Sequence, residues 1–332
     1  MRTDFDNFFI EERYKHISKL GDRLEQVERL ISWESFRPIL SQLYNNRGEK
    51  GGRPNIDEVV MLKVLVLQNW YSLSDEEMEF QIADRLSFQH FIGSATIPDY
   101  STIWTFRERL KKSGLWKKVW DELQRQLDAK NLKVKKGYVQ DATFVESDLG
   151  KKRYTEEKRA EKEGRKVEYT EKQLDHMDTG SSFSIKSGQV HHGYKLSVKE
   201  DVDYQLIRDF ETVTASQHDA TIEQIDGGDI AAYRDKGYFG TSVPVGVKDF
   251  TMDRAVRGRP LTIEQKERNR EISRIRAPGE RPFSVIKTVF NRFKTRYKRI
   301  ERVNIQSMFS CFAYDLYQLF TLKKKGVVGE VI

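Results

Sequence analysis

The stretch that decides the fold is Tyr138-Val139-Gln140-Asp141-Ala142-Thr143. Tyr, Val and Thr favour β-strands, whereas Asp is depleted in them. Because an unpaired buried carboxylate is costly, an aspartate within such a run is expected to meet a charged partner. We therefore predict a strand over residues 137–143, with Asp141 serving as a ligand at its end rather than as a surface charge.

Two later carboxylates occur in contexts that also require an explanation. Residues 229–240 predict a short strand that ends at Asp235-Lys236-Gly237-Tyr238, where the glycine permits a tight turn. Glu280 stands at the predicted start of a helix, and Lys287 lies seven residues further on, at about 20° from it around the helix axis. These three acids suggest a site where carboxylates gather on metal ions to act on a phosphodiester.

A dense run of positive charge follows Glu280. We expect the helix that begins near Glu280 to continue through the basic residues up to 302, among them Arg292 and Lys294. A solvated helix face is the usual explanation of such a pattern. Its position next to a candidate catalytic carboxylate favours contact with phosphate groups, and we include the neighbouring Arg281 and Lys236 in this prediction.

The N-terminal third is predicted to be helical. An apolar helix is expected over residues 56–70, a second over 74–86 and another beginning at Ser101-Thr102 and running through Arg107 to about 110. A helix, a short break and a second helix that begins with Ser or Thr and carries Arg are typical of a helix-turn-helix motif. Ser101, Thr102 and Arg107 are therefore candidate DNA contacts. The alternative is simple bundle packing by the apolar residues of the same helix. A Gly-rich basic loop precedes the first of these helices, and Arg53 within it is a further candidate for binding a polyanion.

Composition limits the class of protein. The 332 residues contain 58 Lys and Arg against 51 Asp and Glu, and this excess of seven positive charges favours an anionic partner. The single cysteine, Cys311, excludes an intrachain disulfide and lies in an apolar run, so we interpret it as core packing. No signal peptide or spanning helix is predicted, and we expect a cytoplasmic protein without a membrane partner.

The hydrophobic period changes from helical to strand-like near Val134. We therefore predict an α+β chain with a helical, helix-turn-helix-like domain over residues 1–132 and a mixed α/β domain over residues 133–332. A stretch of mixed charge near 148–178 is predicted to be an insertion that protrudes from the second domain.

Several of these segments together resemble the D-D-E transposases of prokaryotic insertion sequences. Gly52-Arg53-Pro54, Gln68-Asn69-Trp70-Tyr71, Pro98-Asp99-Tyr100-Ser101-Thr102-Ile103, Asp141-Ala142-Thr143 and Asp235-Lys236-Gly237-Tyr238 are similar to motifs of that family. Arg276, Glu280 and Lys287 fit the spacing of the branch with a Tyr-(2)-Arg-(3)-Glu-(6)-Lys signature, although Ser273 occupies the tyrosine position. Pro278-Gly279 is expected to keep Arg276 off the helix of Glu280, so that Arg276 reaches the site from a loop.

The resemblance implies an RNase H-like catalytic fold with Asp141, Asp235 and Glu280 as catalytic residues and ligands of two Mg²⁺ ions, for which Mn²⁺ can substitute. Arg276 and Lys287 would hold phosphate groups. It also implies double-stranded DNA as the partner, both terminal inverted repeats and target DNA, a homodimer in the DNA complex and a location at the prokaryotic nucleoid. The short interval between Asp235 and Glu280 leaves no room for the all-β insertion of some relatives.

Three alternatives stay open on the sequence. A non-catalytic helix-turn-helix regulator explains the N-terminal third but not the three acids. A metal-dependent nuclease of the same fold explains the acids without strand transfer. A decayed copy that only binds DNA is the third, and the substitution of Ser273 for the signature tyrosine leaves room for it.

Overall fold

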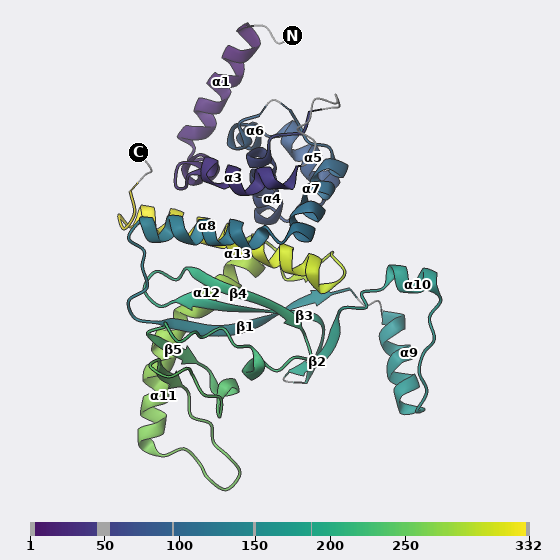
Figure 1. Ribbon diagram of the computed structural model, residues 1–332, viewed down its shortest axis with the longest axis vertical. Helices are drawn as coiled ribbons and strands as arrows, with labels where there is room; N and C mark the ends of the chain where they lie inside the picture. The colour runs from purple at the N-terminus through teal and green to yellow at the C-terminus, as the bar shows by residue number, and fades with distance from the viewer. Residues whose placement is uncertain (1–3, 45–53, 95, 149–150, 187, 330–332) are drawn as a thin grey trace. The chain divides into compact units, whose positions relative to one another are not determined.

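The computed structural model describes residues 4–44, 54–94, 96–148, 151–186 and 188–329 (Figure 1). The chain divides into two compact units: residues 1–133 with 308–332, and residues 134–307. The boundary near residue 133 falls where the hydrophobic period changes. The predicted division differs at the other end, because residues 308–332 group with the N-terminal helices.

The first unit is helical. Its elements are α1 (Asp4–Lys19), α2 (Arg23–Glu28), η1 (Trp33–Phe36), α3 (Arg37–Leu40), η2 (Ser41–Leu43), α4 (Glu58–Trp70), α5 (Asp75–Asp84), α6 (Leu86–Ile92), α7 (Tyr100–Ser113), α8 (Trp116–Ala129) and the C-terminal part of α13 (Ile300–Lys324). Every residue of α4 is buried, as its apolar sequence predicts. Phe312 of α13 packs against Trp33 and Phe36, with ring centroids 6.3 and 5.9 Å apart. These buried aromatic contacts explain why the end of the chain belongs to this unit.

The second unit is built on a mixed sheet. Its strands are β1 (Tyr138–Ser147), β2 (Ser182–Lys186), β3 (Gln189–Asp201), β4 (Ile207–Thr214), β5 (Ala231–Arg234), β6 (Lys248–Thr251) and β7 (Lys294–Thr295). β3 runs antiparallel to β1, and its outer edge pairs with β2 over its first residues and with β4 over the rest. β5 and then β6 continue the sheet on the other side of β1, both parallel to it. A mixed α/β sheet of this kind is consistent with an RNase H-like domain.

β1 is the centre of this sheet. One of its edges pairs with β3 along most of its length, and the other pairs with β5 at the start and with β7 at Glu146 and Ser147. Gly137 allows β1 and β5 to approach closely. Its φ is +110°, and a Cβ placed there would lie only 2.5 Å from the carbonyl oxygen of Ala231.

The basic segment after Glu280 is not one helix, so that prediction is wrong. A helical segment comprising α11 (Ile263–Arg276), η5 (Ala277–Glu280), α12 (Arg281–Ser284) and the π-helical η6 (Val285–Val289) ends before the basic run. Lys294 and Thr295 then form β7, and α13 begins only at Ile300. Phe290, directly after η6, is buried, whereas Phe293 is 40% exposed.

The charged stretch after β1 forms a pair of helices away from the sheet, α9 (Lys151–Lys162) and α10 (Glu171–His176), in the position of the predicted insertion (Figure 1). The remaining short elements are η3 (Asp219–Thr221) and η4 (Lys236–Tyr238). Cys311 is fully buried, as expected for a packing residue. Within the described ranges, no helix has both the length and the apolar character needed to cross a membrane.

Candidate active site

The register of two parallel strands brings Asp141 and Asp235 together. Val139 pairs with Tyr233 and Gln140 with Arg234, so the next step along both strands leads to Asp141 and Asp235. Neighbouring strands lie about 5 Å apart, and residues two apart point to the same face. The two aspartates therefore share the face that carries Val139 and Tyr233.

The helical segment covers this same face. Val139 and Tyr233 belong to one buried cluster with Ile272 of α11. At Gly279, an added Cβ would lie 2.8 Å from Cγ1 of Val139. The backbone of η5 therefore packs directly against the Val139 side chain of β1. The segment is thereby fixed over the strand that ends in the first aspartate.

Arg276 reaches Asp141 from this segment. Its Nη2 lies 3.5 Å from Oδ2 of Asp141, and its Nη1 lies 3.7 Å from the sulfur of Met252. The expectation that Pro278-Gly279 would leave Arg276 on a loop is wrong. Arg276 is the last residue of α11, and the chain changes there to a 3₁₀ turn while it keeps right-handed helical torsions. A proline lacks the amide hydrogen that an α-helix needs, and such a change of helix type accommodates it.

Charge and burial compete at the first aspartate. Burial raises the pKa of the Asp141 carboxyl above its usual value, while Arg276 opposes the rise and Asp235 adds to it. Oδ1 of Asp141 accepts the amide hydrogen of Ala142 at 2.9 Å, and Oδ1 of Asp235 accepts that of Gly237 at 2.7 Å. Two like charges on adjacent strands of a half-buried face favour a bound cation.

Two lysines complete the electrostatic environment. Burial lowers the pKa of Lys287, Lys186 lowers it further, and Glu146 and Asp141 oppose the reduction. Lys186 also acts on the pKa of Asp141. Lys186 was not predicted as a site residue, because it lies at the end of β2, a strand that the sequence analysis did not predict.

Glu280 does not join the two aspartates in one cluster. It is exposed at the end of η5, directly after the glycine that packs on β1. Among the described residues, no three His, Cys, Asp or Glu side chains are placed to hold a metal ion. The structure thus brings Asp141, Asp235, Arg276 and Lys287 together, whereas the role of Glu280 stays a prediction.

The two carboxylates alone fit a divalent cation of the Mg²⁺ type. Carboxylate oxygens are its preferred protein ligands, and Mg²⁺ is commonly held by one or two carboxylates together with substrate phosphates and water. Asp141 and Asp235 provide two such groups on one face. The remaining ligands of the cation would come from groups other than these two carboxylates.

The other predicted phosphate contacts in this unit lie in different environments. Arg292 is buried, which argues against direct contact with a DNA backbone. Arg281 retains a buried Nε with no hydrogen-bond partner among the described residues. Lys236 is exposed directly after Asp235, and the Lys294 ammonium lies 5.6 Å from the centre of the Phe293 ring.

In the first unit, Arg107 does not fit the predicted DNA contact. Its guanidinium is buried and donates to both carboxylate oxygens of Asp75, at 2.7 and 2.6 Å. It therefore joins α7 to the start of α5. Ser101 donates its hydroxyl to Asp99 at 2.8 Å, and the amide of Thr102 donates to the same carboxylate oxygen, so both belong to the N-terminal cap of α7. Arg53 lies outside the described residues.

Replacing Arg107 with Ala is expected to destabilise the first unit by about 2 kcal/mol, because a largely buried carboxylate then loses its charged partner. Urea unfolding followed by tryptophan fluorescence measures this change. Arg125→Ala is the control, since Arg125 forms an exposed pair with Glu122 on α8. Equal stability of the two variants would show that the buried pair contributes nothing special.

Comparison with known families now gives the class of the protein. A Transposase DDE domain model matches residues 127–316, and a Transposase domain (DUF772) model matches residues 11–109. No solved structure matches the chain. The first model covers more than half of the chain, so the protein belongs to the DDE transposase family. It is a DNA transposase of a mobile element, and DNA is its partner.

Proposed function

We propose that the protein binds the terminal inverted repeats of an insertion sequence and carries out metal-dependent strand cleavage and strand transfer into target DNA. The observation that supports this most is the register of β1 and β5, which places Asp141 and Asp235 side by side with Arg276 against the first of them. A regulator that only binds DNA has no use for this arrangement.

Each residue is given a role in the proposed mechanism. Asp141 and Asp235 would hold the divalent cation, and Glu280 would complete its ligands. When bound, such a cation lowers the pKa of the attacking water or hydroxyl and stabilises the leaving oxygen. Arg276 orients the Asp141 carboxylate. Lys287 and Lys186 contact phosphate oxygens and hold the strand without reading its bases.

The test is strand transfer in vitro with the full chain. A labelled duplex that carries the element's own end is incubated with a plasmid target, in Mg²⁺, in Mn²⁺ or in EDTA. Joined product that requires the metal supports the proposal. Binding without cleavage would identify a regulator or a decayed copy, and nicking without joining would identify a nuclease. Crosslinking of the DNA complex tests the proposed homodimer.

The charge of Lys287 predicts a pH dependence. Because its pKa is lowered, Lys287 loses its proton at a lower pH than an ordinary lysine. The affinity for a terminal duplex is therefore expected to fall as the pH rises from neutrality toward the ordinary pKa of lysine. In Lys287→Arg the guanidinium stays charged, so the affinity should fall less over the same range.

Fluorescence anisotropy at fixed ionic strength measures this dependence. Lys323→Arg provides a control at a lysine in the part of α13 that belongs to the first unit. If the wild type and Lys287→Arg lose affinity equally over this range, Lys287 is not the group that titrates.

A further inference from the structure

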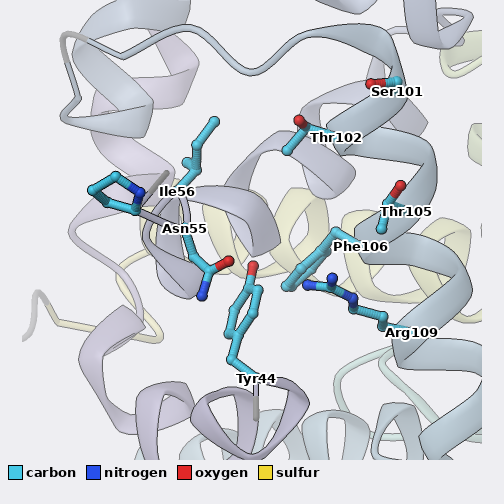
Figure 2. A pocket seen from close by; sticks show the side chains of 9 residues that line it. Tyr44, Asn55, Ile56, Ser101, Thr102, Thr105, Phe106 and Arg109 are labelled. Carbon is cyan, nitrogen blue, oxygen red and sulfur yellow. The ribbon is translucent and has the colours of Figure 1, made fainter. Parts of the chain in front are cut away.

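The first unit contains a cavity of about 190 Å³ beside α7. Residues from three segments line it. They are Tyr44 after η2, then Pro54, Asn55 and Ile56 before α4, and Ser101, Thr102, Thr105, Phe106 and Arg109 of α7. Figure 2 shows the Tyr44 hydroxyl beside the Asn55 amide, with the Arg109 guanidinium directed toward Phe106. We call this cavity the α7 pocket.

The charge of the lining favours an anion. Among the described residues that line it, Arg109 alone is charged and none is acidic. The carboxylates close to the lining residues in sequence already have partners. Glu108, next to Arg109, pairs with Lys111 at 2.6 Å. Asp57 pairs with Arg37 at 2.6 Å and caps α4, and Asp99 caps α7.

Arg109 differs from the buried arginine of the same helix. Its guanidinium lies 5.3 Å from the centre of the Tyr44 ring, a cation–π contact that orients it without using its N–H groups. Within the part of the chain that the structure describes, it has no carboxylate partner, whereas both nitrogens at the end of Arg107 bind Asp75. A planar guanidinium held in this way is suited to donate hydrogen bonds to two phosphate oxygens at once.

The neutral groups of the pocket fit the same ligand. Thr102 and Thr105 carry hydroxyls on the α7 side, and Asn55 contributes an amide from the opposite side (Figure 2). Ser, Thr, Asn and Tyr side chains together with Arg supply most contacts to DNA phosphate oxygens. The exposed face of α5 cannot serve this purpose, since its Glu76, Glu77 and Asp84 would repel a DNA backbone.

We propose that the α7 pocket binds one backbone phosphate of the DNA duplex, with Arg109 as the charged ligand and Thr102, Thr105 and Asn55 as neutral partners. This inference rests on the proposed function and specifies which surface of the first unit contacts the DNA. It replaces Arg107 by Arg109 as the DNA-binding arginine of α7.

The experiment compares the full chain with its Arg109→Ala variant in binding to labelled duplexes, one with the element's end and one with an unrelated sequence. Affinity should fall roughly tenfold for both duplexes, because a charge-assisted hydrogen bond is lost. The slope of log affinity against log salt should decrease by about one, as expected when one phosphate contact is removed. Arg109→Lys should keep the slope and lose only part of the affinity.

Lys118→Ala is the matched control, since it removes one exposed positive charge from α8 outside the pocket. The inference is overturned if Arg109→Ala keeps the wild-type slope, or if it loses affinity only for the element's own end, which would indicate base reading. A wild-type chain that binds no duplex would instead overturn the proposed function. Thermal unfolding of each variant verifies that the exposed substitutions leave the fold intact.

Discussion

Replacing Asp141 with Asn is expected to reduce strand cleavage and joining at least about a thousandfold, while binding of a terminal duplex changes less than about twofold. The amide keeps the shape of the side chain but removes the charge that would hold a cation together with Asp235. It also removes the partner of Arg276, whose Nη2 lies 3.5 Å from the carboxylate. Single-turnover assays on a pre-cleaved and an uncleaved end separate joining from cleavage.

The matched control is Asp121→Asn, which alters an exposed aspartate on α8. It should react at the wild-type rate. Cleavage by Asp141→Asn at a rate within about tenfold of the wild type would remove Asp141 from the catalytic residues. Loss of DNA binding in the same variant would instead indicate that the carboxylate acts through the fold.

Replacing Gly137 with Ala is expected to cost about 4 kcal/mol of unfolding free energy, from backbone strain and from overpacking together. The strain arises because Gly137 has a φ of +110°. The overpacking arises because the new Cβ would lie 2.5 Å from the carbonyl oxygen and 2.8 Å from the Cβ of Ala231. Urea unfolding measures the cost. Since β1 and β5 would have to separate at their start, catalysis should fall more than DNA binding.

Gly240→Ala separates the two causes. Gly240 has a φ of +90° but no atom within 4 Å of its added Cβ, so this variant contains the strain alone. It should be destabilised by about half as much or less. Equal destabilisation of both variants would show that the close approach of β1 to β5 carries no steric cost.

The two aspartates could be predicted because each is a local exception. Asp141 interrupts a run of strand-forming residues, and Asp235 precedes a glycine turn, so both signals lie within a few residues of sequence. Their adjacency depends on the parallel pairing of distant strands, which no local pattern contains. The same reason explains why Lys186 was missed, since only the pairing of β2 with β3 places it near Lys287.

Local rules also gave wrong answers where tertiary packing decides. Pro278 and Gly279 are typical helix breakers, yet the segment keeps helical backbone torsions where Gly279 packs against Val139. This arrangement leaves Arg276 within 3.5 Å of Asp141. Arg107 and Arg109 are alike in sequence context. They differ because Asp75, at the start of α5, forms an ion pair with Arg107 but not with Arg109.

The pairing of Gln140 with Arg234 limits how the length of the chain can vary. Deleting one residue within β5 would turn Asp235 to the opposite face of the sheet, because side chains alternate along a strand. Deleting two residues would return the Asp235 side chain to its original face, but it would then lie two residues away from its present position along β1. Changes in the connection between β4 and β5 leave the register intact. β5 itself therefore has to keep its length for the two aspartates to meet.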